Sequence, residues 1–221
     1  MFNKQNRVMQ NGEMQNGEMQ NRVKQNRIKQ ICLAVILLII FTILPPPAAV
    51  NAEVSAEAIK NSSVVLVKLK VLQGDAKGNL NLNNKIKRSE FFTLVVRMLG
   101  YDREKNDSAT TPDALSFTDI SPKHWSYNYF VAAYRHGLVK GYTDGTVKPD
   151  KYVTYAEALT VILRALGYNK ELSAGEWPAS ALLLAKEKAI DKEVVLPKDK
   201  QLTRGETSVI IYNSLTVSFN Q

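Results

Sequence analysis

The sequence predicts an all-α fold built from three repeated helix–turn–helix units. Three segments of the 221-residue chain align on a glutamate, at Glu90, Glu157 and Glu206. Each glutamate is followed by apolar or near-apolar residues at the spacing of one face of an amphipathic helix. In the first two segments, a turn with two glycines precedes the helix at the same distance. Repetition of helix and turn together predicts one repeated structural unit.

The helices that carry these glutamates are expected to begin at Arg88, Tyr155 and Arg204. Two of the three starts are capping boxes, in which a threonine accepts from the glutamate N–H and the glutamate accepts from the threonine N–H. The helix-capping residues are Thr154, Glu157, Thr203 and Glu206. The first copy has Lys87 in place of the threonine. Capping explains the glutamates without any catalytic role.

The turn before each of the first two helices is expected to share one conformation. Residues 71–90 align with residues 138–157 without a gap. The alignment pairs Gly74 with Gly141 and Gly78 with Gly145. Tyr142, Thr143 and Asp144 precede Gly145, and an Asp-Gly pair is a turn signal.

Residues 117–168 resemble an S-layer homology motif. The segment has the opening Phe-x-Asp-Ile, the His-Trp pair, a Gly-Leu-Val-x-Gly-Tyr-x-Asp-Gly-Thr turn, a Pro-Asp pair and a Thr-x-Ala-Glu helix start. The flanking copies are degenerate, the first having Ala58 where Trp125 aligns and the third lacking the Gly-Tyr-x-Asp-Gly turn. We therefore expect motif 1 in residues 53–101, motif 2 in 102–168 and motif 3 in 169–221.

The resemblance implies a pseudo-trimeric bundle with three prongs. It also implies that grooves between the prongs bind pyruvylated secondary cell-wall polysaccharide. The polysaccharide-binding residues expected on this basis are Arg88, Arg204, Tyr155, Trp125, Gly141, Tyr142 and Asp144.

Two arginines give a physical reason to expect that an acidic ligand binds. Arg88 and Arg204 occupy the first helical position, where the helix dipole disfavours a cation. A guanidinium beside free helix N-terminal amides forms a site for a carboxylate, such as the pyruvate ketal of the family's ligand. The alternative is a solvated arginine at a helix start. The middle copy has Tyr155 instead, which can stack on a sugar but cannot neutralise a carboxylate, so that groove is expected to be weakened.

The two tryptophans, Trp125 and Trp177, leave two interpretations open. Their spacing relative to the following apolar residues favours a buried position on a helix. The alternative is a place in the lining of a sugar-binding groove.

Residues 1–52 are expected to be a leader that ends in a secretory signal peptide. Five Gln-Asn pentads span residues 5–29, and the apolar run 31–44 follows with Val50 and Ala52 at the positions before a cleavage site. The run is shorter than the roughly 20 residues of a membrane span, which disfavours an uncleaved anchor. Contact with a membrane is therefore expected only through the signal peptide.

Composition excludes several other functions. The formal charge of +8 and the pI near 9.4 come partly from the leader, and an exported chain is not expected to bind nucleic acid. Cys32 is the only cysteine, and His124 and His136 lack a third ligand, so neither a metal nor a cofactor is expected. Motifs typical of hydrolases and phosphate-binding enzymes are absent from the sequence, which indicates a protein that is not an enzyme.

The sequence therefore predicts a secreted protein at the surface of a bacterium, of the Gram-positive type, that is held non-covalently to an acidic wall polysaccharide. The alternative is a degenerate scaffold that mediates protein–protein interaction at the cell surface. The oligomeric state is not predicted.

Overall fold

The computed structural model of the protein describes residues 53–103 and 117–220. The pentad leader and the signal peptide predicted in residues 1–52 lie outside the described residues. Within the described ranges, each helix is too short or too polar to span a membrane.

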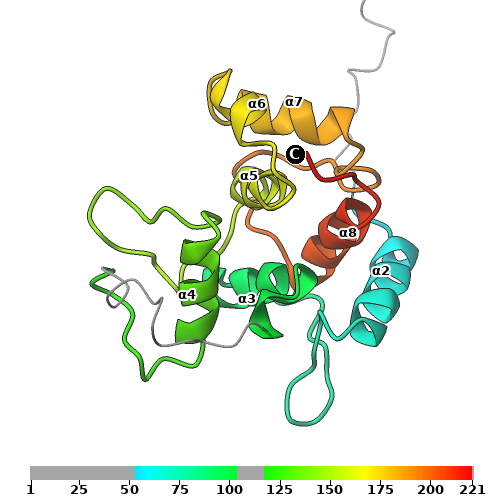
Figure 1. The fold of residues 1–221 in the computed structure, drawn as a ribbon. Helices are drawn as coiled ribbons and strands as arrows, with labels where there is room; N and C mark the ends of the chain where they lie inside the picture. Colours follow the sequence, from blue (N-terminus) through cyan, green and yellow to red (C-terminus); the bar gives the residue numbers. More distant parts are fainter. Residues whose placement is uncertain (1–52, 104–116, 221) are drawn as a thin grey trace, which may run out of the picture. The chain divides into compact units, whose positions relative to one another are not determined.

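Helices are the regular secondary structure of the described residues, and the all-α prediction is confirmed (Figure 1). Their strand pairing is limited to isolated bridges between residue pairs. The helices are α2 (Ala56–Lys68), α3 (Arg88–Met98), the short 3-10 helix η1 (Tyr101–Arg103), α4 (Tyr127–Arg135), α5 (Tyr155–Ala165), α6 (Asn169–Ser173), α7 (Ala179–Glu187) and α8 (Arg204–Ser214). We refer to the sequence segments 53–101, 102–168 and 169–221 as repeats 1, 2 and 3.

The helices α3, α5 and α8 begin where their sequences predict. Thr154 Oγ1 accepts from the Glu157 N–H at 3.4 Å, and Glu157 Oε2 accepts from the Thr154 N–H at 3.0 Å. Thr203 and Glu206 make the same pair of hydrogen bonds, at 3.1 and 2.8 Å. In α3 only the glutamate half is present, because Lys87 has no oxygen to offer. These bonds satisfy amides that a helix start otherwise leaves unpaired.

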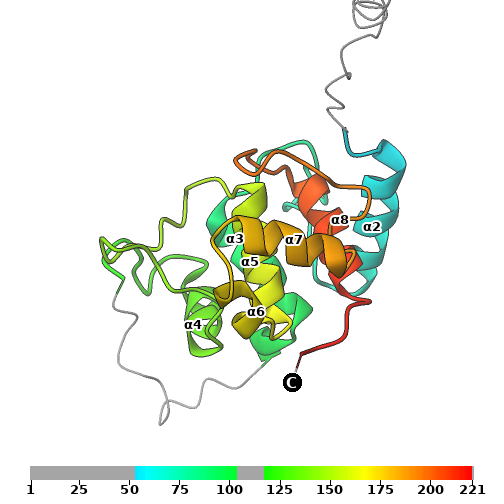
Figure 2. The same ribbon diagram turned by 90° about the horizontal axis from the view of Figure 1, so that it is seen from above.

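The three helices α3, α5 and α8 contact one another, and each also packs against the first helix of another repeat. Helix α4 packs on α3, α7 packs on α5, and α2 packs on α8, as Figures 1 and 2 show. Leu94, Ile162 and Ile210 belong to a single buried core, which confirms the prediction that the three apolar faces meet. The second helix of each repeat is therefore covered by a different repeat.

Backbone hydrogen bonds close the three repeats into a ring. The residue four positions before each glutamate takes part, and all three of these residues are buried. Ile86 N donates to Leu202 O at 2.9 Å, Leu202 N donates to Val153 O at 2.9 Å, and Val153 N donates to Ile86 O at 3.1 Å. Each repeat thus donates to one neighbour and accepts from the other. This ring fixes where the three central helices begin.

Candidate functional site

Two grooves of similar composition lie where repeats meet. We name them after the arginine that lines each one. The Arg204 groove has a volume of about 760 Å³, and the Arg88 groove has a volume of about 300 Å³. The Arg204 groove includes Gly74, Glu90, Thr93, Arg97, Trp125 and Arg204. The matching residues of the Arg88 groove are Gly141, Glu157, Thr160, Arg164, Trp177 and Arg88.

Each groove takes residues from all three repeats. Its glycine, glutamate, threonine and first arginine come from one repeat, and these four recur at an offset of 67 residues. The second arginine, Arg204 or Arg88, begins a central helix of another repeat. The tryptophan, Trp125 or Trp177, precedes the first helix of the remaining repeat. The same combination of side chains is therefore assembled twice.

Arg88 and Arg204 both hold the loop of a neighbouring repeat. Arg88 is only 7% exposed, and its Nε donates to Val147 O at 2.9 Å. The Nε of Arg204 donates to Leu80 O, also at 2.9 Å. Val147 and Leu80 occupy equivalent positions, 67 residues apart. The interpretation of these arginines as solvated side chains is therefore wrong, since both make a structural contact.

The helix N-terminal amides beside these arginines are not free. The first-residue amides of α3, α5 and α8 donate at 2.9 Å to carbonyls of another repeat's loop, those of Lys151, Lys200 and Asn84. The second-residue amides donate likewise to Pro149, Lys198 and Leu82. The expectation that a carboxylate binds these amides is wrong, because assembly of the repeats already uses them. An anion in either groove must therefore be bound by side chains, the arginines among them.

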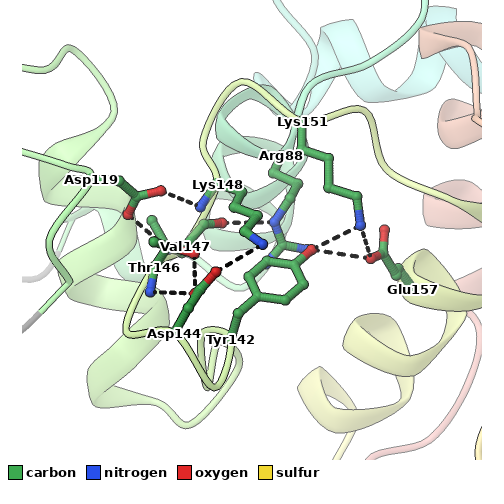
Figure 3. Close-up of polar contacts among 9 residues, drawn as sticks. All are labelled: Arg88, Asp119, Tyr142, Asp144, Thr146, Val147, Lys148, Lys151 and Glu157. Carbon is green, nitrogen blue, oxygen red and sulfur yellow. Dashed lines mark hydrogen bonds and ion pairs between the residues drawn. The ribbon is translucent and has the colours of Figure 1, made fainter.

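The Glu157 carboxylate is held by three groups. Besides the Thr154 N–H, Lys151 Nζ donates to Oε1 at 3.0 Å and the Tyr142 hydroxyl donates to it at 3.2 Å (Figure 3). Burial raises the pKa of this carboxyl, but the hydrogen bonds from Thr154 and Lys151 and the charges of Lys151 and Arg88 outweigh burial, so the pKa of Glu157 lies below its ordinary value. Glu157 is therefore ionised at neutral pH.

Tyr142 lies among three cations in the turn of repeat 2 (Figure 3). The Lys148 ammonium is 4.3 Å from its ring centroid, that of Lys151 is 5.1 Å away, and the Arg88 guanidinium carbon is 5.0 Å away. Such cation–π contacts keep the ring in place against the groove. Tyr142 is half-buried, so part of its surface is open to a ligand.

Asp144 shapes the same turn. Its carboxylate accepts from the Thr146 hydroxyl and N–H and pairs with Lys148 Nζ at 3.1 Å. The hydrogen bonds from Thr146 and Lys148 lower the pKa of Asp144 to about 2. Asp119, from the Phe-x-Asp element, accepts from the Val147 and Lys148 amides at 2.8 and 2.7 Å. Both aspartates are thus acceptors within the turn, where they pair with groups of the turn itself.

Gly141 is required by the turn in two ways. Its φ is +73°, a conformation that side chains rarely adopt, and a Cβ there would lie 2.4 Å from Cε1 of Phe117. At Gly145 the φ is also positive, but a Cβ would meet nothing within 4 Å. Gly141 therefore brings the chain against Phe117, and its contribution to the groove is its backbone.

The tryptophans are exposed, and the prediction that they lie in the core is wrong. Trp125 is 59% exposed and Trp177 is 58% exposed. Both precede their helices, since α4 begins at Tyr127 and α7 at Ala179, so helical periodicity does not apply to them. Each indole lines a groove, and Trp177 Nε1 donates to Thr160 Oγ1 at 3.0 Å.

Tyr155 is buried, so its ring is not placed to stack on a sugar. It is 1% exposed and lies in the core. Burial raises the pKa of its hydroxyl well above the ordinary value. The junction that Tyr155 belongs to also lacks the other groove residues. The positions equivalent to the groove threonine, arginine and tryptophan are held by Val209, Asn213 and Ala58.

Arg97 and Arg164 were missed by sequence reasoning. Both lie seven residues after the repeat glutamate, so their recurrence is visible in the aligned copies. Arg97 donates to the Tyr129 hydroxyl at 2.9 Å. Arg164 makes no hydrogen bond or ion pair with the residues that the structure describes, and burial lowers the pKa of its guanidinium. Each groove therefore contains two arginines.

The described residues contain no group of three histidine, cysteine, aspartate or glutamate side chains placed to hold a metal ion. The grooves accordingly offer arginine, tryptophan and hydroxyl groups to a ligand. This set suits a molecule with both a flat apolar face and a negative charge.

The sequence is similar to those of known proteins of one family. Residues 116–159 match the model of the S-layer homology domain. The chain is 34% identical to the Middle cell wall protein of Brevibacillus brevis over 149 residues, which cover 67% of this chain and 14% of that protein. It is 32% identical to the Surface layer protein of Brevibacillus choshinensis over 161 residues, 70% of this chain and 14% of that protein.

A third relative is the Cellulosome-anchoring protein of Acetivibrio thermocellus. It is 33% identical over 95 residues, which cover 43% of this chain and 21% of that protein. The chain thus spans about a seventh of the length of the first two relatives. The match at residues 116–159 covers the turn and the start of α5, which contribute Gly141, Tyr142 and Glu157 to the Arg88 groove. This chain is therefore a protein with an S-layer homology domain.

Proposed function

We propose that this protein attaches to the bacterial cell wall by binding an acidic secondary cell-wall polysaccharide in the Arg204 and Arg88 grooves. The observation that carries the proposal is the repeated set of two arginines, a threonine and an exposed tryptophan in each groove. The protein is located outside the cell, at the cell surface. Names of relatives such as Cellulosome-anchoring protein and Middle cell wall protein support an anchoring role.

The chemistry of the grooves supports a pyruvylated glycan as the ligand. An exposed indole offers an apolar face to a sugar ring, and a guanidinium binds a carboxylate through two parallel hydrogen bonds. A pyruvate ketal places a carboxylate directly on a sugar, so one residue of the glycan presents both features. The junction with Tyr155, Asn213 and Ala58 lacks these groups, and we propose that it binds no glycan. Binding requires no catalytic group and no cofactor.

Sedimentation with purified cell walls tests the proposal. The protein should pellet with intact walls and stay in solution when the polysaccharide has been stripped from the peptidoglycan. A Trp125→Ala/Trp177→Ala variant is the matched control. Both side chains are exposed, so the variant should keep its fold but pellet less with intact walls. Equal sedimentation with stripped walls would contradict the proposal and would favour the alternative scaffold that binds another surface protein.

A further inference from the structure

The two grooves differ at one repeat position that governs their charge. Lys151 holds Glu157 in the Arg88 groove, with Nζ 3.0 Å from Oε1. The equivalent residue in the Arg204 groove is Asn84, 67 residues earlier. Among residues 53–103 and 117–220, Glu90 has no lysine partner, and its Oε1 instead accepts from a terminal nitrogen of Arg204 at 3.0 Å.

The presence of Lys151 or Asn84 determines how many guanidinium N–H groups remain available to a ligand. In Arg204, Nε donates to Leu80 O, one terminal nitrogen donates to Glu90, and the other donates to Gln73 O at 3.1 Å. Each nitrogen of that guanidinium thus makes one hydrogen bond, and within the described residues two of its five N–H groups are left over. In Arg88 only Nε is engaged, and neither terminal nitrogen makes a hydrogen bond or ion pair within residues 53–103 and 117–220.

The surroundings of Arg88 supply little negative charge. Its guanidinium lies over the rings of Phe92 and Tyr142, with centroid distances of 5.3 and 5.0 Å. The Glu157 carboxylate, which feels the charge of Arg88, is already paired with Lys151. Arg164 adds a second half-buried guanidinium to the same groove without a partner in the described part of the chain. A buried charge without a counter-ion favours binding of an anion.

We infer that Lys151 is a positioning residue that binds Glu157 and thereby leaves Arg88 available to the carboxylate of the ligand. The Arg88 groove is then the stronger carboxylate site, and the Arg204 groove is occupied by its own Glu90. This inference rests on the proposed function, because it ranks the two grooves that the proposal assigns to the glycan. A ligand in the Arg204 groove must therefore displace Glu90 or share the guanidinium with it.

The two tryptophans allow each groove to be followed separately. The chain has only Trp125 and Trp177, one in each groove, so their two indole N–H signals in a ¹⁵N spectrum report on one groove each. The probe is a methyl hexopyranoside that carries a pyruvate ketal, and its methyl ester is the uncharged control. The Trp177 signal should shift with a Kd about tenfold lower than the Trp125 signal, as one charge-assisted hydrogen bond requires. The ester should bind both grooves weakly.

Exchanging Lys151 and Asn84 should reverse which groove binds the charged probe more tightly. Lys151→Asn should raise the Kd reported by Trp177 about tenfold, and Asn84→Lys should lower the Kd reported by Trp125 by a similar factor. Adding Glu157→Gln to Lys151→Asn should restore binding, because the neutral side chain no longer competes for Arg88. A lysine that touched the ligand directly would give no such rescue. Gln also preserves the capping box, so the fold is kept.

Three outcomes contradict the inference in different ways. If neither indole signal moves, the proposed function fails with it. If both signals move with one Kd and the exchanged variants leave it unchanged, glycan binding stands and the role of Lys151 is wrong. If the double variant binds as weakly as Lys151→Asn, Lys151 acts on the ligand itself and not through Glu157. Unchanged circular dichroism spectra show that all variants remain folded.

Discussion

Trp177 Nε1 donates a hydrogen bond to Thr160 Oγ1 across the boundary between repeats 2 and 3. The distance is 3.0 Å, and the same hydroxyl donates to Ala156 O at 2.7 Å. The indole is therefore exposed but fixed to helix α5. In the Arg204 groove, Thr93 donates to Ser89 O, and Trp125 makes no hydrogen bond to it in the described residues. The two tryptophans are thus held to different degrees.

Thr160→Val should weaken glycan binding in the Arg88 groove by several-fold. The substitution keeps the shape of the side chain but removes a hydrogen bond of about 0.5–1.5 kcal/mol that orients the indole. Titration calorimetry with cell-wall polysaccharide measures the effect. Thr93→Val is the matched control, because it removes the groove hydroxyl without releasing Trp125, so its loss of affinity should be smaller than that of Thr160→Val. Equal losses in both variants would show that the threonines act through the helices and not through the indole.

Arg204→Ala should lower the free energy of unfolding by about 2–3 kcal/mol, because it leaves Glu90 and two carbonyls without their charged donor. The sequence assigns Arg204 a role in binding only and does not reveal these internal partners. Urea denaturation measures the difference. Lys148→Ala removes an exposed ion pair and should change stability by less than about 0.5 kcal/mol. An Arg204→Ala protein as stable as its parent would mean that these bonds contribute nothing.

Tyr155→Arg should not increase binding to cell walls, although the sequence suggests that it restores a third site. The side chain at this position is buried, and Asn213 and Ala58 replace the arginine and tryptophan of the other grooves. A charge in this place should destabilise the fold by roughly 2 kcal/mol or more. Tyr155→Phe keeps the ring and should remain close to the parent. A gain in wall sedimentation for Tyr155→Arg would show that this junction opens to ligand.

Stability should rise with pH through the range where Glu157 ionises. The pKa of Glu157 in the folded state lies below its ordinary value of about 4.3, so the unfolded state binds more protons in that interval. The stabilisation is present above about pH 4.3 and is lost as the pH falls through the folded pKa. Denaturation between about pH 6 and pH 3 should show a smaller slope for Glu157→Gln than for the parent. Identical slopes would mean that Glu157 is not stabilised by folding.

The starts of the central helices could be predicted from sequence because their causes are local. A threonine and a glutamate three residues apart determine the cap, and the apolar residues that follow determine the face. The predicted starts at Arg88, Tyr155 and Arg204 match the structure. The same pattern predicts the shared core, because each apolar helix face must be buried against another element.

The composition of the grooves could be predicted only in part, because each groove combines three repeats. Arg88 pairs with the loop of repeat 2, and that partner is set by the order in which the repeats pack. Helical spacing misplaced Trp125, which lies in the turn just before α4. Arg97 and Arg164 could have been predicted, because each lies seven residues after the repeat glutamate. The capping role of the glutamates does not extend to these positions.

The ring through Ile86, Val153 and Leu202 also limits how this protein can be lengthened or shortened. Open arrays of repeats grow by adding units at either end, and their terminal units can be removed one at a time. Here the last repeat donates to the middle one and accepts from the first, so both ends of the array are already used. A shortened chain that lacks repeat 3 would expose two unpaired backbone groups and the apolar sides of α3 and α5. The ring therefore stays open until the segment around Leu202 has been synthesised, so the first two repeats cannot complete their backbone hydrogen bonds before the third joins them.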